Sequence, residues 1–335
     1  MLKAQGIGLV FLLGTCFVLL EWLHQFPVLT GKAFTSDHVS AAERRKTDLE
    51  VGRLRRLRSG NFEVNGFFPV EDVRDRGSRI PKILHQIYLD GEDVYQSNSA
   101  NDSNRLQATW RDGCRRLHNG WQIHFWDLDK AEGFLQKKAA WFLPAFRALP
   151  KTVLKGDVLR PFLMYHIGGM YLDIDVECYR PADPILVGWD MVLQSEYSEG
   201  QDISNAVLAS APGLPYWEAL IEAAAAAADA IANKRRLDAM DVLHATGPPL
   251  YTQVFKQVAH PHAANNVVGA WKLQNAWVRV YGLDSFFVPC VWMDRDCHEA
   301  VTKRHLSNAW IQDDLVGHHH YLGSWLADVE PVKQS

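Results

Sequence analysis

The two aspartates of Asp173-Ile174-Asp175 have the residue type and spacing to hold a divalent cation. They end an apolar stretch that predicts a strand, and residues two apart in a strand point to the same face. Two adjacent carboxylates repel each other unless a cation lies near them, and oxygen ligands of this kind suit Mg²⁺ or Mn²⁺. Such a pair is common in exposed turns. Here it lies at the predicted carboxyl edge of a sheet, where α/β proteins form ligand sites.

Asp157 and Arg160 lie three residues apart in a predicted helix over 155–169 and therefore share a helix face. Arg160 could bind a phosphate or a sugar hydroxyl, and Asp157 could accept hydrogen bonds from hydroxyls. The structural alternatives are an ion pair within the helix, or Asp157 as the N-cap with Pro161 in the first turn. The spacing by itself favours the structural alternatives.

Histidines supply further candidate ligands and bases. In an extended His318-His319-His320 segment only the outer two share a face, whereas in a loop any of the three could bind a metal. His166 is a candidate base for a metal-dependent hydrolase, or a histidine at a helix end. Trp325, after Ser324, offers either a stacking surface or a core ring.

The elements that must position these residues alternate between strand and helix. The sequence predicts strands over 80–91, 120–129 and 170–178, and helices over 130–143, 155–169 and 215–243. This alternation predicts an α/β fold with a mostly parallel sheet. The segment 267–325, with Pro289 and several glycines, predicts an irregular second lobe.

Composition limits the class of protein. The chain has 335 residues, 47% hydrophobic and 22% charged, and a formal net charge of -4, which offers no basis for nucleic-acid binding. Five cysteines are too few for a disulfide scaffold. Three pairings are open to the four that lie outside the apolar amino end, and none of their spacings resembles a metal-binding pair. These four are Cys114, Cys178, Cys290 and Cys297.

The amino end carries an apolar run over residues 6–20. We expect a cytosolic tail over 1–5, a signal-anchor helix over 6–23 and a charged stem over 24–78, with a cleaved signal peptide as the alternative. The domain then spans 79–330 and a short tail spans 331–335. Either version places the domain in a lumenal or extracellular space, where the sequon at Asn101 can be glycosylated.

Five segments together resemble glycosyltransferase family 32. They are RIPKILHQIYLDG, TVLKGDVLRPFLMYHIGGMYLDIDV, ISNAVLAS, HATGPPLY and HHHYLGSW, and they occur in the order seen in that family over residues 79–326. The family includes fungal α-1,6-mannosyltransferases, inositolphosphoceramide mannosyltransferases and the glycosyl-transferring domains of large clostridial toxins. The last three segments, through ISNAVLAS, HATGPP and the closing GSW, look most similar to the inositolphosphoceramide enzymes.

The resemblance implies a GT-A fold with a mixed, mostly parallel sheet, and sugar transfer with retention of configuration. It implies Mn²⁺ or Mg²⁺ as cofactor and a nucleotide-sugar donor, GDP-mannose or a UDP-sugar. The acceptor would be a lipid or a glycan, and the chain a single-pass type II protein of the Golgi or endoplasmic reticulum membrane. The resemblance also implies the site residues. Asp175 would bind the metal with His319 or His320, and Asp173 would contact the metal, the ribose and the sugar. Asp157 and Arg160 would bind the sugar hydroxyls, Tyr88 would stack on the base, Asn205 would line the donor pocket, and Ser324 and Trp325 would close over the diphosphate.

Three departures from the family pattern bear on this assignment. Tyr88 stands where a base-stacking Trp is usual, and Pro161 interrupts a helix that relatives continue. The spacing between the histidines and Trp325 is not fully regular, which leaves the choice of histidine open. The alternatives are a transferase for galactose or N-acetylglucosamine that uses a UDP-sugar, and a non-catalytic lumenal sugar-binding protein of the same fold.

Overall fold

A computed structural model describes residues 77–92, 102–197, 202–232, 234, 236–259, 266–283, 285–292, 294–306, 315–323 and 326. The predicted tail, anchor helix and nearly all of the stem lie outside these residues, as do Asn101, Ser324, Trp325 and the carboxyl-terminal tail. Within the described part, no helix has both the length and the apolar character needed to cross a membrane.

The architecture is a seven-stranded sheet in the order β2-β1-β3-β6-β5-β8-β7, beside a two-stranded ribbon of β4 and β9. Five of the seven strands run in one direction, and β6 and β7 oppose them, which confirms the expected mixed α/β fold. The strands are β1 (Ile83–Ile87), β2 (Gln122–Trp126), β3 (Gly169–Leu172), β4 (Val176–Cys178), β5 (Met191–Ser195), β6 (Ile203–Ser210), β7 (Gly269–Leu273), β8 (Ala276–Tyr281) and β9 (Gly317–His319).

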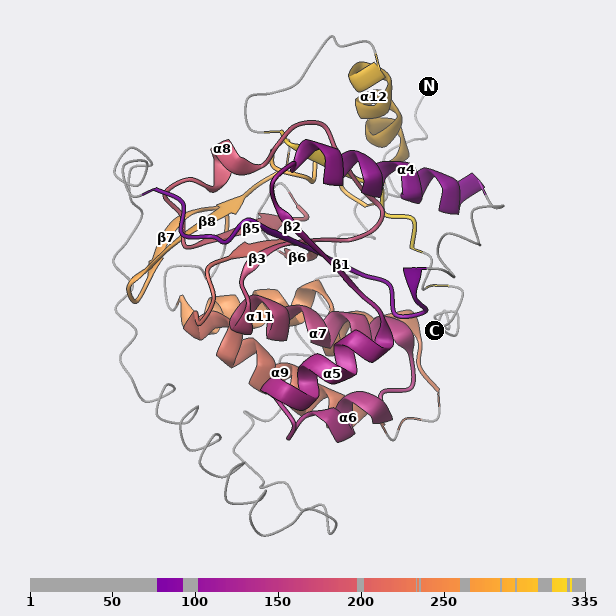
Figure 1. Cartoon of the computed structure of the whole chain (residues 1–335), viewed down its shortest axis with the longest axis vertical. Coiled ribbons are helices and arrows are strands. Elements are labelled where there is room, and N and C mark those ends of the chain that lie inside the picture. The colour runs from indigo at the N-terminus through magenta and orange to yellow at the C-terminus, as the bar shows by residue number, and fades with distance from the viewer. Residues whose placement is uncertain are drawn as a thin grey trace, which may run out of the picture. The chain divides into compact units, whose positions relative to one another are not determined.

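Helices cover both faces of this sheet, with α5, α6, α7, α9 and α11 on one face and α4, α8 and α12 on the other (Figure 1). The helices are α4 (Asp102–Leu117), α5 (Leu128–Lys138), α6 (Leu143–Ala148), α7 (Thr152–His166), α8 (Asp183–Leu186), α9 (Pro215–Ala232), α10 (Ala239–Thr246), α11 (Pro248–Val258) and α12 (Arg295–Leu306).

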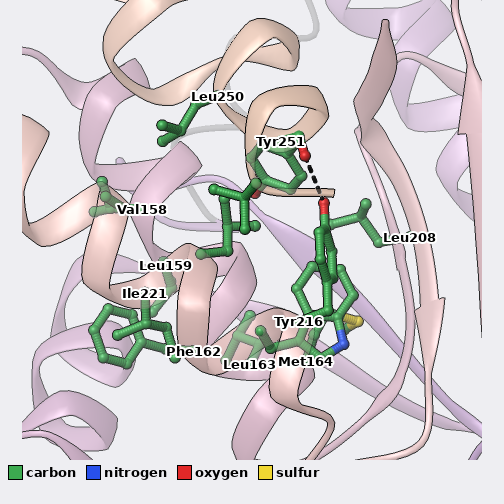
Figure 2. Close-up of a cluster of buried hydrophobic side chains, with 14 of the residues drawn as sticks. Val158, Leu159, Phe162, Leu163, Met164, Leu208, Tyr216, Ile221, Leu250 and Tyr251 are labelled. Atoms are coloured by element: carbon green, nitrogen blue, oxygen red, sulfur yellow. Dashed lines mark hydrogen bonds between the residues drawn. The ribbon is translucent and has the colours of Figure 1, made fainter. Parts of the chain in front are cut away.

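The main apolar core lies between the sheet and the α7 side. Phe162 of α7 stacks on Phe142 with ring centroids 4.9 Å apart, and Trp217 of α9 is completely buried. Figure 2 shows how α7, α9 and α11 bring their side chains together, with the Tyr216 hydroxyl donating to the carbonyl of Tyr251 at 3.1 Å. This core anchors α7, the helix that carries Asp157 and Arg160.

The opposite side is held partly by covalent and polar contacts. One disulfide joins Cys114 of α4 to Cys178 of β4, and a second joins Cys290 to Cys297. The structure thus settles the pairing that spacing left open. The first bond ties the ribbon to the outer helix, so that the ribbon can hold residues at the edge of the sheet.

Three expectations about elements are wrong. The strand expected over 170–178 breaks into β3 and β4, because the Asp173 N–H bonds to the carbonyl of Ala206 and the chain then turns, with the Val176 N–H on the Asp173 carbonyl. The helix expected over 215–243 ends at Ala232, and a capping box at Asp238 begins α10. The segment 267–325 forms no separate lobe, since β7 and β8 extend the main sheet.

Candidate functional site

The turn that leads into β3 requires glycine. Gly168 and Gly169 have φ of +71° and +97°, and a Cβ on Gly169 would lie 2.6 Å from the carbonyl oxygen of Ile83. His85 holds the same turn, donating from Nε2 to the Gly168 carbonyl at 2.8 Å and accepting from Trp126 Nε1 at 3.0 Å. Burial lowers the pKa of His85 to about 4, so the ring stays neutral. These contacts fix where β3 ends and Asp173 begins.

Helix α7 runs through Pro161 without a break, so Asp157 lies inside the helix and is not its N-cap. A proline cannot donate to the carbonyl four residues earlier, which here belongs to Asp157. That carbonyl accepts from the Tyr251 hydroxyl at 3.4 Å instead. The side chain of Asp157 is engaged on both oxygens, by Asn205 Nδ2 at 3.1 Å and by Thr246 Oγ1 at 2.7 Å.

Arg160 connects this buried carboxylate to the turn of Asp173-Ile174-Asp175, the DXD turn. Its guanidinium lies 3.2 Å from Asp157 Oδ1 and 2.9 Å from Asp173 Oδ1, and it donates to the carbonyl of Asn205 at 3.0 Å. The Tyr171 hydroxyl also donates to Asp173 Oδ1, and the guanidinium packs over the Tyr171 ring at 4.8 Å. The ion pair within the helix is therefore real, and it belongs to a larger network that orients Asp173.

Asp175 is held by the carboxyl-terminal part of the domain. His319 Nε2 lies 3.3 Å from Asp175 Oδ1, and the N–H of Leu322 donates to Oδ2 at 2.9 Å. Ligand atoms of Asp173, Asp175 and His319 all lie within 4.8 Å of one another. Nδ1 of His319 is buried and makes no hydrogen bond. Two carboxylates and an imidazole form a donor set that fits Mn²⁺ or Mg²⁺.

The pKa values of the two carboxylates in the DXD turn shift in opposite directions. Burial raises the pKa of Asp173 despite the Arg160 charge. Burial also opposes ionisation of Asp175, but the His319 charge and hydrogen bond together with the Leu322 N–H hold the pKa of Asp175 at about 2. Asp175 is therefore ionised at neutral pH. Burial raises the pKa of Asp157 to about 6, with Arg160 opposing the shift.

Reasoning from the sequence missed three residues around this site. Thr246 occurs in the HATGPP segment, but only the tertiary contact shows that it binds Asp157. Burial raises the pKa of Glu196 to about 7 at the end of β5, where His319 and Asp173 act on its charge. Tyr321, at φ +50°, stacks on His319 with its hydroxyl buried and without a partner. Tyr321 lies within the HHHYLGSW segment but was not assigned a role, and no motif in the sequence marked Glu196.

The other candidate residues lie outside the cluster of Asp173, Asp175 and His319. His320 lies 3.1 Å from Glu177, on the face of the ribbon away from Asp175, so His319 is the histidine that joins the DXD turn. Tyr88 directly follows β1 and is half-buried; its stacking role stays a prediction. His166 packs edge-on against Phe134 at the end of α7, which is the structural role foreseen for it.

Comparison with known proteins agrees with this geometry. Residues 104–192 match a family model described as a glycosyltransferase sugar-binding region containing a DXD motif. This part of the chain is similar to a glycosyltransferase sugar-binding region. The matched residues include Asp157, Arg160, Asp173 and Asp175, and the match agrees with the resemblance found in the sequence.

Curated relatives extend the likeness. Inositol phosphoceramide mannosyltransferase 1 of Schizosaccharomyces pombe is 34% identical over 143 residues, covering 41% of this chain and 40% of its own length. The mannosyl phosphorylinositol ceramide synthase SUR1 of Saccharomyces cerevisiae is 27% identical, with coverage of 56% and 44%. The initiation-specific α-1,6-mannosyltransferase of Candida albicans is 24% identical, with coverage of 64% and 56%. The match thus spans about two fifths of the length of the first of these relatives.

Among solved structures, the PaToxG glycosyltransferase aligns over 65% of this chain and 80% of its own at 15% identity, with a TM-score of 0.34. That likeness is too distant to bear on the fold or the chemistry.

Proposed function

We propose that the chain is a metal-dependent, retaining glycosyltransferase that transfers mannose from GDP-mannose to an inositolphosphoceramide-like lipid. The proposal rests on one observation, which is that two sets of residues meet at one edge of the sheet. Asp157, Arg160 and Asn205 form a buried polar network, and it meets the cluster of Asp173, Asp175 and His319. The names of the relatives favour mannose as the transferred sugar and an inositolphosphoceramide as the acceptor.

Each residue has a separate part in this proposal. Asp175 and His319, with Asp173, would hold Mn²⁺ or Mg²⁺. When bound, such a cation stabilises the negative charge that develops on a departing diphosphate. Asp173, oriented by Arg160 and the Tyr171 hydroxyl, would contact the ribose and the sugar.

In this proposal Asp157 has a positioning role and does not act as the nucleophile. Both of its carboxylate oxygens already accept hydrogen bonds, and one also lies against Arg160, so neither is available as a nucleophile. This favours attack by the acceptor hydroxyl on the face from which the diphosphate leaves. Trapping a covalent sugar adduct on Asp157 would contradict that mechanism.

The cellular placement is part of the proposal. We assign the chain to the Golgi or endoplasmic reticulum membrane as a single-pass type II protein, with the anchor over 6–23 and the domain in the lumen. The two disulfides support this placement, because disulfides persist in oxidising compartments. Detection of the full-length chain in the cytosolic fraction would contradict it.

The test uses the full-length chain with GDP-mannose, UDP-galactose and UDP-N-acetylglucosamine, each with Mn²⁺ or EDTA. We expect transfer or hydrolysis from GDP-mannose that is lost in EDTA and in Asp175→Asn. The matched control is Asp129→Asn, on an exposed position of α5, which leaves turnover unchanged. Turnover of a UDP-sugar instead would reassign the donor. Binding of nucleotide without turnover in the presence of lipid acceptor would favour a non-catalytic sugar-binding protein.

A further inference from the structure

The β4–β9 ribbon presents two chemically different faces. Its antiparallel register pairs Val176 with His319 and Glu177 with His318. Because side chains alternate along a strand, His319 faces Asp175 while its neighbours face the other way. On that other face, ligand atoms of Glu177, His318 and His320 all lie within 4.8 Å of one another. The ribbon therefore carries two clusters, back to back.

The second cluster is embedded in stacked rings from three elements. Trp110 of α4 stacks flat on His320 with centroids 3.8 Å apart, His320 lies 4.2 Å from His318, and His318 stacks on His298 of α12 at 5.1 Å. Glu177 accepts from His320 Nε2 at 3.1 Å. The arrangement fixes each imidazole from both sides, as a ligand site requires.

Hydrogen bonds also set the tautomer of His318. His298 Nε2 faces the carbonyl of Val291 at 3.2 Å, so that nitrogen carries the proton. With that proton on Nε2, the Nδ1 of His298 is an acceptor, and His318 Nε2 donates to it at 2.8 Å. The lone pair of His318 then lies on Nδ1. A ring that donates from one nitrogen and keeps a lone pair on the other is the state in which histidine binds metals.

The geometry points to a second cation site, of the zinc type, formed by Glu177, His318 and His320. Two imidazoles and one carboxylate are a donor set typical of Zn²⁺, whereas the DXD cluster is dominated by oxygen. The 3.1 Å between His320 Nε2 and Glu177 Oε2 is close to the ~3.3 Å edge of a tetrahedron with bonds of about 2.05 Å.

Two neighbouring features define this site further. Cys290 lies near His298 and His318 but is bonded to Cys297, so it offers no thiolate. An open pocket of about 340 Å³, lined by Trp110, Glu177 and Arg116 among others, lies beside Glu177 and gives solvent access for a fourth ligand. A cation here would cross-link β4 to β9 and the residue that follows it, and so hold His319 in place on the opposite face. The inference does not depend on the proposed transferase activity.

The test is zinc retention by the full-length chain, measured by competition with a chelator and by metal analysis after dialysis. We expect Glu177→Gln and His320→Gln to weaken zinc binding by ~100-fold or more. Asp175→Asn, which disrupts the DXD cluster alone, keeps zinc affinity within about threefold of the unmodified chain. X-ray absorption of that variant should show two imidazole ligands.

Three outcomes would overturn the inference. One is a chain that retains no zinc, and another is zinc lost in Asp175→Asn but kept in Glu177→Gln. The third is equal retention in all variants. If His320→Gln does not fold, the test relies on Glu177→Gln, because the side chain of Glu177 is partly exposed. Far-UV circular dichroism checks that each variant is folded.

Discussion

The two sides of the central sheet are stabilised in different ways. The side of α7, α9 and α11 is an apolar core of stacked aromatic and aliphatic side chains (Figure 2). The side of α4, α12 and the ribbon has a smaller apolar cluster, two disulfides and a row of histidines. The site lies where these sides meet, with Arg160 from the first and His319 from the second.

The difference follows from what each side must hold. Apolar packing is strong and non-directional, so it suits a helix layer that only has to support α7. The ribbon has to aim polar groups at the sheet edge, and short strands bury too little surface to do so by packing. Disulfides and polar contacts hold the ribbon in position instead. We therefore expect catalysis and stability to respond to changes on different sides.

The largest expected effect is on activity. Asp175→Asn removes the ionised carboxylate at the DXD turn and should lower turnover by about 10³-fold. Asparagine is nearly isosteric and still accepts the Leu322 N–H, so the melting temperature should change little. Sugar turnover and thermal unfolding are measured on the same sample. A variant that loses both together would show that the ribbon also depends on this charge for folding.

The reverse pattern is expected in the apolar core. Phe162→Ala removes a buried ring that stacks on Phe142 and should destabilise the fold by about 3–5 kcal/mol. Below its unfolding transition the variant should keep its turnover, because Phe162 touches no site residue in the described contacts. Urea unfolding gives the stability and an assay at low temperature gives the activity. A large loss of turnover in the folded variant would mean that α7 shifts when its core is opened.

Removal of the disulfide between α4 and β4 should act on both properties. The bond spans 64 residues. The double variant Cys114→Ser with Cys178→Ser should lower the free energy of unfolding by about 2–4 kcal/mol, because the unfolded chain gains conformational entropy when the bond is absent. The ribbon loses its tie to α4, so metal affinity should fall as well. The comparison is Cys290→Ser with Cys297→Ser, where the bond spans seven residues and the cost should be smaller. Equal costs would indicate that strain in the native state outweighs loop closure.

The smallest effect is a change in pH dependence. Burial raises the pKa of Glu196 to about 7, so the folded chain holds this proton over a range of pH in which the unfolded chain has lost it. Stability should therefore fall as pH rises from about 4.5 to 7, and Glu196→Gln should remove that fall. Urea unfolding in EDTA at pH 5 and pH 8 measures it, beside Asp129→Asn. A stabilisation that is equal at both pH values would show that Glu196 does not titrate as described.

Local patterns in the sequence were enough for much of the fold and for the central carboxylates. The apolar stretch before the first Asp-Gly predicts β1, and the Gly-Gly stop predicts the end of α7. Asp157, Arg160, Asp173 and Asp175 stand out by type and spacing, and the structure brings them together. Such signals are local, because hydrogen bonding and apolar periodicity act within a few residues.

The tertiary structure alone decided the rest, because each answer depends on contacts between distant segments. The pairing of β4 with β9 selects His319 for the DXD turn and directs His320 to Glu177. The same long-range packing joins Cys114 to Cys178, and it buries Glu196 among charges. A shift of one residue in register would exchange the histidines between the two faces, and no local pattern determines that register.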